Sequence, residues 1–229
     1  MRPETVLEQT DWRALEHSHG PAWPQTPRLL AGLLTGDRDD ARRALSHLWE
    51  ELFHQGTIYG ATPAAARFVA AALADPRVRA QPGPTREYGD GPLAAALLHW
   101  LSGLGYAMGV QWRELFGDGP FVEKIGGPLR PMRPRLHAVV TAFLDDPDDY
   151  VRDAALIAAV NLASASELAP HRAALSARVR ATIAADPHWC HTSTAVLNLR
   201  YWGEHGLPAA KPAKPAYEPQ QGSYDDPPF

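Results

Sequence analysis

Apolar residues recur at helical spacing along most of the chain. Between Asp39 and His54, apolar side chains fall three or four residues apart, and charged side chains occupy the positions between them. The same spacing predicts helices over residues 27–34, 39–54, 63–74, 93–106, 134–143, 147–162, 168–185 and 190–205. No stretch alternates apolar and polar residues with the two-residue period of a strand. We therefore predict an all-α fold without a sheet.

Two distant parts of the chain share one pattern. When residues 34–52 are written above residues 144–162, each shows a short helix, an aspartate-rich turn and a longer apolar helix. The matched positions include Leu34 with Leu144, Asp39 with Asp149, Arg42 with Arg152, Ala44 with Ala154 and Leu52 with Leu162. A weaker third copy begins at Asp186-Pro187. Because one helical pair cannot bury its apolar stripe alone, the pattern predicts that neighbouring pairs stack.

The most regular copy resembles a known repeat. Residues 144–155, LDDPDDYVRDAA, resemble the inner helix of a HEAT repeat, and residues 36–48 resemble a divergent copy. The resemblance implies an armadillo-like α-solenoid, an α-α superhelix of about four HEAT-like helical hairpins. It further implies that Asp149 and Arg152 bridge adjacent repeats, as the corresponding pair Asp39 and Arg42 would.

The resemblance covers about two of the four expected hairpins. The third copy departs from the pattern, since His191-Thr192 stand where Val-Arg is expected. Pro- and Gly-rich insertions, from Asp75 to Gly91 and from Gln111 to Arg133, interrupt the period. We expect a solenoid domain over residues 1–206, followed by a Pro-rich tail over residues 207–229 that is too poor in apolar residues to pack.

Composition narrows the functional classes. The chain has 229 residues, of which 45% are apolar, and this length can form a core without disulfides or metals. Its single cysteine excludes an internal disulfide framework, and no apolar run approaches the about 18 residues of a membrane span. The first residues lack the apolar stretch of a secretory signal, so we expect a cytoplasmic protein without a membrane partner. The net charge of −4 makes a nucleic-acid partner unfavourable, although 19 of the 22 basic residues are arginine.

The segment from His54 to Thr62 is the most distinctive polar stretch. Helix capping explains part of it, since His54 suits a last helical turn, Gly56 a left-handed helix end and Thr62 an N-cap before Pro63. Thr26 before Pro27 has the same cap signature. Capping leaves three residues of the segment unexplained, and these predict a polar contact surface at a helix corner: Gln55, Thr57 and Tyr59. The stretch also resembles a similarly placed segment in uncharacterised bacterial HEAT-like proteins.

Aromatic and arginine residues supply the other contact candidates. Trp49, Trp100 and Trp202 fall on the second helices of their pairs, where they either fill the core or anchor a partner. Arg130, Arg133 and Arg135 form a dense basic patch, which is either a solvated turn or a surface for an acidic partner. The candidate partner-binding residues are Trp49, His54, Gln55, Thr57, Tyr59, Trp100, Arg130 and Arg133.

Residues that could carry chemistry do not form a complete set. Glu51 and His54 have the Glu-x-x-His spacing of di-iron bundles, but those sites need a second such pair. His188, Cys190 and His191 lie too close in sequence for easy tetrahedral zinc ligation, and we interpret Cys190 as a small buried thiol. Glycine-rich phosphate loops and the Gly-x-Ser-x-Gly nucleophile motif are absent. We predict no cofactor, no metal and no catalytic residue.

Three functions follow from these observations. The first is a non-catalytic protein-binding module, acting as a scaffold or adaptor, or as an immunity protein that occludes a toxin. The second is a HEAT-like DNA glycosylase for alkylated bases, in which Trp100 or Trp202 would act with Asp118. The third is a homo-oligomeric scaffold whose two insertions make self-contacts.

Overall fold

The described part of the chain is mostly helical. The computed structural model describes residues 1–83, 91–109 and 127–207. The α-helices of this part are α1 (Pro3–Gln9), α2 (Gln25–Ala31), α3 (Arg38–Glu50), α4 (Thr62–Leu73), α5 (Pro76–Arg79), α6 (Leu93–Ala107), α9 (Arg133–Thr141), α10 (Asp149–Leu162), α11 (Arg172–Ala185) and α12 (Thr192–Tyr201). The all-α class is thereby confirmed. No described helix is both long and apolar enough to cross a membrane. The predicted tail lies outside the described residues, apart from Leu207.

One small sheet was not expected. Strand β1 (Glu16–His17) pairs with antiparallel β2 (Gly20–Pro21) in a hairpin near the N-terminus. Gly20 has a φ of +126°, a conformation that residues with a Cβ rarely adopt. The prediction of no sheet is therefore wrong at this point, because two-residue strands are too short to produce a detectable alternation.

Helix starts follow the aspartates rather than the threonines. Asp37 and Asp148 cap α3 and α10, and their side chains accept hydrogen bonds from the backbone N–H groups of Asp40 and Val151. The predicted caps at Thr26 and Thr62 are wrong, because both residues lie inside their helices. Their buried hydroxyls instead make tertiary hydrogen bonds, Thr26 with His47 and Thr62 with the carbonyl of Leu52.

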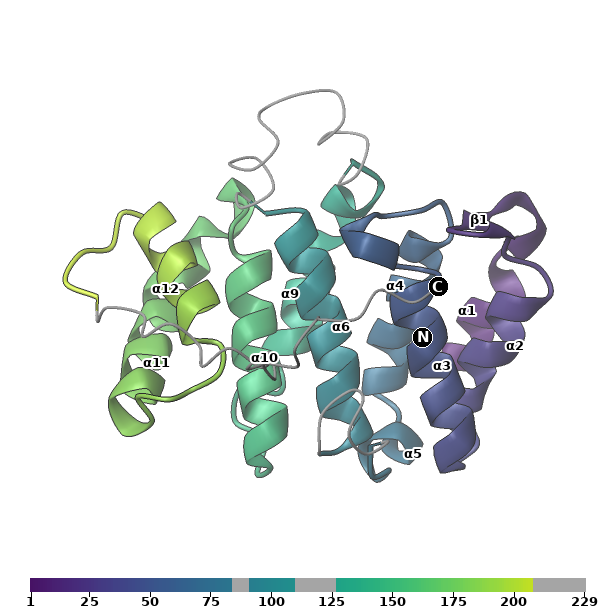
Figure 1. Cartoon of the computed structure of the whole chain (residues 1–229), viewed down its shortest axis with the longest axis horizontal. Coiled ribbons are helices and arrows are strands. Elements are labelled where there is room, and N and C mark those ends of the chain that lie inside the picture. Colours follow the sequence, from purple (N-terminus) through teal and green to yellow (C-terminus); the bar gives the residue numbers. More distant parts are fainter. Residues whose placement is uncertain (84–90, 110–126, 208–229) are drawn as a thin grey trace, which may run out of the picture.

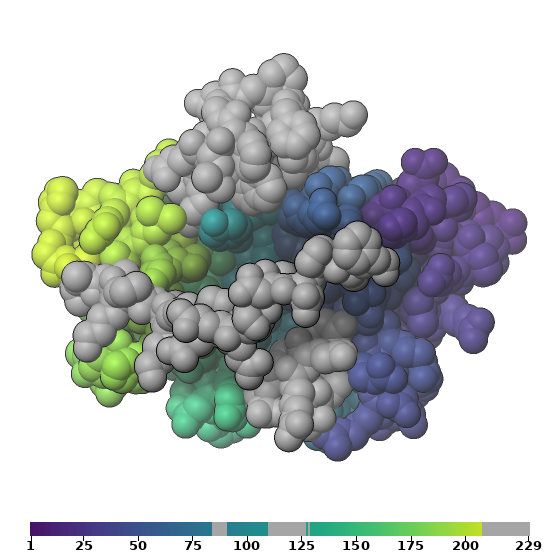
Figure 2. Space-filling view, in the orientation of Figure 1, coloured from purple at the N-terminus to yellow at the C-terminus, as the bar shows by residue number. Residues whose placement is uncertain are grey.

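The helices follow one another along the long axis of the molecule. Figure 1 shows α1, α2 and α3 at one end, α6, α9 and α10 in the middle, and α11 and α12 at the other end. The same progression of sequence is visible on the surface in Figure 2. Helices α3, α6, α10 and α12 contact one another in that order, and the α6–α10 contact is the most extensive between described elements. Buried apolar side chains from Val6 to Leu199 form one continuous core.

The ion pairs of the aspartate-rich turns differ from those that the resemblance to HEAT repeats implies. Arg152 pairs with Asp149 of its own helix and donates to the carbonyls of residues 146 and 147, and Arg42 lies 3.6 Å from Asp39. These pairs are local, so the prediction that they bridge adjacent repeats is wrong. The bridges between elements come from other arginines. Arg79 of α5 lies 3.0 Å from Asp146, and Arg178 of α11 lies 2.9 Å from Asp145.

Candidate functional site

A cavity of about 380 Å³ lies beside the loop that follows α3. We call it the Gln55 pocket. Its residues come from this loop, from α6, from α10 and from the start of α12: Phe53, Gln55, Gly56, Ser102, Gly103, Tyr106, Ile157, Asn161, His191 and Thr194. Four segments distant in sequence therefore meet at one hollow of the surface.

The loop at this pocket has an unusual backbone. Gln55 lies in the left-handed region, with φ of +50° and ψ of +34°, and Gly56 follows with φ of +77°. Gln55 is the one residue other than glycine with positive φ among the described residues, and its side chain is exposed. A left-handed backbone costs an L-residue about 1–2 kcal/mol. Strain of this kind concentrates at functional positions.

Hydrogen bonds between helices make the wall of the Gln55 pocket rigid. Asn161 of α10 donates to the hydroxyl of Ser102 on α6, with a distance of 2.9 Å. Asn198 of α12 donates in turn to the side-chain oxygen of Asn161 at 3.0 Å. All three side chains are buried, so this row fixes α6, α10 and α12 relative to one another.

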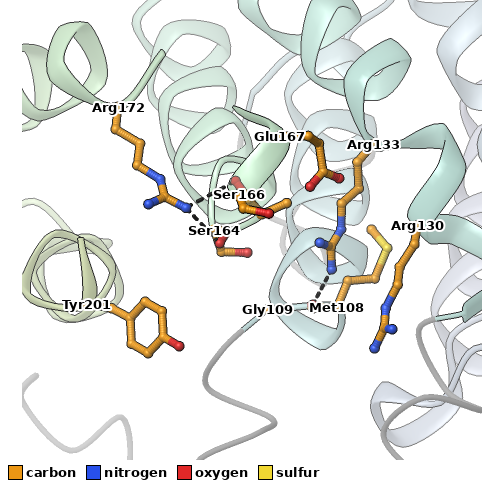
Figure 3. A pocket seen from close by; sticks show the side chains of 10 residues that line it. Met108, Gly109, Arg130, Arg133, Ser164, Ser166, Glu167, Arg172 and Tyr201 are labelled. Carbon is orange, nitrogen blue, oxygen red and sulfur yellow. Dashed lines mark hydrogen bonds between the residues drawn. The ribbon is translucent and has the colours of Figure 1, made fainter. Parts of the chain in front are cut away.

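A second cavity, of about 390 Å³, contains three arginines. We call it the arginine pocket. It is lined by Met108, Gly109, Arg130, Arg133, Ser164, Ala165, Ser166, Glu167, Arg172 and Tyr201. Figure 3 shows Arg172 and Tyr201 on one side of the hollow, with Arg130 and Arg133 on the other. The basic patch that the sequence predicted thus contributes two of its members to a concave site.

Two of these arginines are held by the ends of helices. Arg172 donates to the carbonyls of Ala163, Ser164 and Ala165, the C-cap of α10 and the two residues after it, at 2.9–3.1 Å. Buried Arg133 donates to the carbonyl of Met108 at the end of α6. The last carbonyls of a helix have no partner within it and carry partial negative charge, so a guanidinium is favourable there. These contacts fix the cations at the edge of the cavity.

The two pockets lie along the same faces of three helices. Ile157 and Asn161 on α10 and Ser164 in the turn after it are spaced by four and then three, which continues one stripe. The same spacing relates residues 102, 106 and 109 of α6 and the turn after it, and a spacing of seven relates Thr194 to Tyr201 on α12. The pockets are therefore successive parts of one surface, which we call the α6–α10–α12 groove.

Of the eight predicted contact residues, three line a pocket, four lie outside both pockets, and Trp100 lies in the core. Gln55 lines the Gln55 pocket, and Arg130 and Arg133 line the arginine pocket. Trp49, His54, Thr57 and Tyr59 are half-buried and line neither cavity. The ring of Trp49 lies close to Gly103 of α6, one of the residues that line the Gln55 pocket.

The prediction of Trp100 as a partner-binding residue is wrong. It has no exposed surface, and its indole Nε1–H donates to the carbonyl of Leu48 at 2.9 Å. It therefore joins α6 to α3 in the core and cannot act as a surface anchor. The interpretation of Cys190 as a buried thiol is also wrong, because this residue is exposed. Partial burial of its thiol, followed by the negative charge of Asp153, raises the pKa of Cys190 and lowers its reactivity.

Sequence reasoning missed most of the groove. The missed lining residues are Ser102, Tyr106, Ile157, Asn161, Ser164, Ser166, Glu167, Arg172, Thr194 and Tyr201. One signal was present, since Asn161 interrupts the otherwise apolar run at the end of α10. A buried amide in such a run needs partners on another element.

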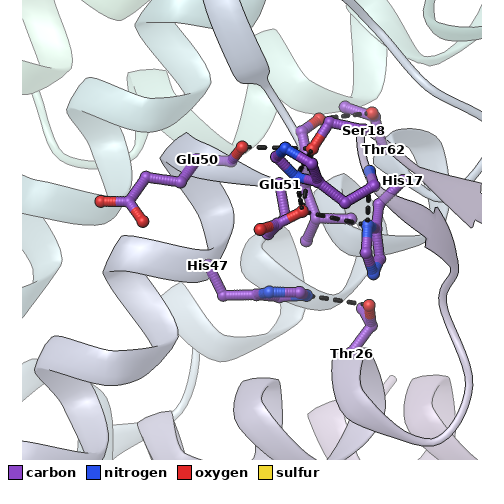
Figure 4. A network of polar contacts seen from close by, with 9 residues as sticks. His17, Ser18, Thr26, His47, Glu50, Glu51 and Thr62 are labelled. Carbon is purple, nitrogen blue, oxygen red and sulfur yellow. Dashed lines mark hydrogen bonds and ion pairs between the residues drawn. The ribbon is translucent and has the colours of Figure 1, made fainter.

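A polar network near the N-terminus was a further candidate for chemistry (Figure 4). The carboxylate of Glu51, the residue that follows α3, accepts from His19 Nδ1 at 2.7 Å and from Ser18 Oγ at 2.8 Å, and lies 3.1 Å from His17 Nδ1. Against the opposing effect of burial, the hydrogen bonds from His19 and Ser18 lower the pKa of Glu51. The network fastens the hairpin of β1 and β2 onto the end of α3.

The same geometry does not form a nucleophilic triad. Ser18 Oγ and the Glu51 carboxylate both contact Nδ1 of His19, whereas a triad needs one ring nitrogen for each partner. In the described part of the chain, no three His, Cys, Asp or Glu side chains are placed to hold a metal ion.

Comparisons with known proteins do not assign the chain to a family. No family model, no curated protein and no solved structure matches its sequence or fold. The HEAT-like relationship therefore stays a prediction.

Proposed function

We propose that this chain is a non-catalytic protein-binding module, built as an α-α superhelix of HEAT-like hairpins. In this proposal the α6–α10–α12 groove holds an extended segment of a partner protein. The partner is either a component of an assembly, with this chain as its scaffold or adaptor, or a toxin that this chain occludes as an immunity protein.

One observation carries the proposal. Residues of three helices, and of the turns that follow α6 and α10, fall on matching stripes, so that two cavities of about 380 and 390 Å³ follow one another along one surface. Cavities of a few hundred Å³ suit small ligands and single side chains. Two such cavities in line favour a chain that places one side chain in each.

The chemistry of the Gln55 pocket also favours binding. Its buried polar groups are a hydroxyl and an amide, and both already hydrogen bond across helices. Half-buried His191 also lines the pocket, and burial, reinforced by His99, lowers the pKa of its ring to about 4, so the ring is neutral at neutral pH. Groups of this kind give orientation and specificity without transferring protons at neutral pH. The exposed, strained Gln55 at the rim adds one further polar contact.

The glycosylase alternative has less support. Trp100, one of the two aromatic residues assigned to it, is fully buried, and Trp202 is half-buried against Arg172. Asp118 lies outside the described residues, as does most of the second insertion, on which the oligomeric alternative depends.

A peptide selection tests the proposal. We expect that peptides selected on the protein from a random phage-displayed library share one motif and compete with one another. Thr194→Trp places an indole in the Gln55 pocket, because half-buried Thr194 lines it, and should weaken binding at least tenfold by fluorescence anisotropy. Ser193→Trp is the matched control, since Ser193 is exposed on the same helix and lines neither pocket.

The control defines the outcome that would reject the proposal. Both variants should melt within a few degrees of the wild type by circular dichroism. A selection without a shared motif, or equal binding by the two tryptophan variants, would show that the groove is not the binding surface.

A further inference from the structure

We propose that the Gln55 pocket releases its partner on acidification, because protonation of the His99–His191 ring pair displaces His191 from the pocket wall. This inference rests on the proposed function and specifies how binding at that site is regulated. The module holds its partner at neutral pH and releases it at mildly acidic pH.

Two imidazole rings from different elements face each other at the edge of the Gln55 pocket. His191 lines the pocket and is the N-cap of α12, and the centroid of its ring lies 5.1 Å from that of His99 on α6. Both residues are half-buried, and neither ring has a hydrogen-bond partner among the described residues. Helix α12 packs mainly against α10 and α11, so this ring pair joins the start of α12 to α6.

A proton on His191 is unfavourable for three reasons. Partial burial withdraws the ring from water, which disfavours its charged form. The ring lies against a second imidazole, and two charged rings at this distance repel each other. His191 also precedes the first turn of α12, where the helix dipole presents partial positive charge. Consistent with this geometry, burial and then His99 lower the pKa of His191 to about 4, and burial lowers the pKa of His99.

The acidic residues of the described chain do not compensate a charge on this pair. Asp153 of α10 and Asp186 of the turn before α12 act on the thiol of Cys190 and raise its pKa. No carboxylate of the described residues acts on the ring of His191 or on that of His99. A protonated pair therefore lacks the counter-ion that would keep both rings in place.

The other neighbours of His191 are uncharged or face elsewhere. Tyr106 of α6 lines the same pocket with a phenol, which carries no charge in acid. The neutral indole of Trp189 meets the ring of His191 edge-on, with centroids 5.5 Å apart. His54, in the loop after α3, has its ring against His19 instead. The repulsion within the pair is therefore relieved by movement of a ring into water.

Such a movement changes the pocket because His191 stands at the start of α12. Thr194, in the first turn of this helix, lines the same pocket, whereas Asn198 in the next turn is held by its hydrogen bond to Asn161. The displacement therefore falls on the first turn and on the pocket wall. A partner that covers His191 buries its ring further and binds the neutral form. By linkage, the bound state holds fewer protons, and affinity falls as pH decreases.

The test compares the affinity of one selected peptide at pH 7.5 and pH 4.5 by fluorescence anisotropy. The peptide contains no histidine, aspartate or glutamate, and circular dichroism verifies that the protein is folded at both pH values. Binding should be about fivefold weaker at pH 4.5, since the pair takes up a proton between the ordinary pKa of histidine and about 4.

Two double variants assign this pH dependence. His99→Gln/His191→Gln removes both titrating rings and should reduce the change in affinity to less than twofold. His188→Gln/His205→Gln is the matched control, because both residues are exposed and flank α12, and it should keep the change of the wild type. A pH dependence that persists in the first variant would place the titrating group elsewhere and overturn the assignment to this pair.

NMR titration of the two rings in the wild type is a second measurement, which decides if the first variant misfolds. The midpoint of His191 should lie well below the ordinary value for histidine and should fall further with the peptide bound, because binding and protonation oppose each other reciprocally. A midpoint at the ordinary value, or one that the peptide leaves unchanged, would reject acid regulation.

The outcomes separate this inference from the proposed function. If the folded protein binds the peptide equally at both pH values, acid regulation is rejected and the binding module stands. If the selection yields no peptide, the binding module is rejected and the backbone amide signals of Thr192 and Thr194 test the displacement. Signals that shift together with the ring of His191 support it, and signals that do not shift reject it.

Discussion

At the scale of single residues, the backbone conformation of Gln55 is unfavourable for stability and points to a role in binding. The residue has a left-handed conformation, and its exposed side chain makes no hydrogen bond with the described residues. No hydrogen bond within the described residues therefore favours a glutamine at this position. A residue retained in a strained conformation without a structural partner is a good candidate for a contact with another molecule.

This strain predicts opposite consequences for two substitutions. Gln55→Gly removes the conflict between Cβ and the left-handed backbone, whereas Gln55→Ala keeps it, so the glycine variant should be more stable by about 1 kcal/mol. Urea unfolding followed by circular dichroism measures the difference. Both variants remove the amide and should weaken the selected peptides equally. An alanine variant as stable as the glycine variant would mean that the backbone at residue 55 is unstrained.

Residue-level errors of the sequence analysis have a common cause. Thr26 and Thr62 carry the local signature of a cap, but His47 and the carbonyl of Leu52 approach their hydroxyls from other parts of the chain. Local patterns contain no information about such partners. Trp100 lies on α6, which is apolar on nearly all sides, so periodicity could not show whether the indole faces a partner or the core.

At the scale of elements, the contact between α6 and α10 depends on a glycine. A Cβ at Gly105 would lie 3.1 Å from both the Cβ of Asn161 and the backbone nitrogen of Leu162. These atoms belong to the body of α10 and cannot rotate away. Gly105 therefore sets the distance between two helices that line the Gln55 pocket and whose following turns line the arginine pocket.

Gly105→Ala should destabilise the fold, although alanine favours helix by about 1 kcal/mol over glycine. The backbone clash should outweigh that gain and leave a net loss of about 1–3 kcal/mol. Gly103→Ala is the comparison on the same helix, since its Cβ would meet ring atoms of Trp49 and Phe53 rather than backbone. Thermal unfolding of both proteins checks the order. If Gly105→Ala raises the melting temperature, the close approach of α6 and α10 is wrong.

Helical periodicity predicted the boundaries of some helices and missed those of others. It predicted α6 and α10 nearly as they are, because apolar residues extend through both helices. It extended the segment after Asp39 to His54, whereas α3 ends at Glu50. Leu52 and Phe53 keep the apolar pattern but are buried in the following turn, and burial alone does not distinguish a turn from a helix. The short α1 and α5 were not predicted, because so few residues produce no period.

At the scale of the whole molecule, the repeat predicted from the sequence pairs two helices but does not indicate the α6–α10–α12 groove. The alignment paired α3 with α10, and these helices contact α6 from different parts of the chain. The sequence of α6 lacks the Asp and Arg positions of the other two, so the repeat pattern passed over the helix that joins them. The groove arises from α6, α10 and α12 together, and no single segment contains its signal.

Two buried histidines, together with half-buried His191, should make stability depend on pH. Burial, reinforced by a neighbouring histidine, lowers the pKa of His47, of His137 and of His191 to about 4. Each of these rings lies within 5.4 Å of the ring of another histidine, measured between centroids: His47 with His17, His137 with His171 and His191 with His99. The paired rings belong to different elements, so a charge on both would oppose the packing of the fold.

The sign of the effect follows from the direction of these shifts. An unfolded histidine takes up a proton near pH 6.5, whereas the folded rings stay neutral until about pH 4. The unfolded state therefore binds more protons in this window, and the free energy of unfolding should fall as pH decreases from 6.5 to 4, by on the order of 2–3 kcal/mol for each buried ring.

Urea unfolding at pH 7.5, 6 and 5 should show the decline. His137→Leu should remove part of it, because His137 is buried and its Nε2 has no hydrogen-bond partner within the described residues. The same change at exposed His188 is the matched control and should leave the slope unaltered. Equal slopes for His137→Leu and the wild type would show that His137 does not stay neutral in the fold at mildly acidic pH.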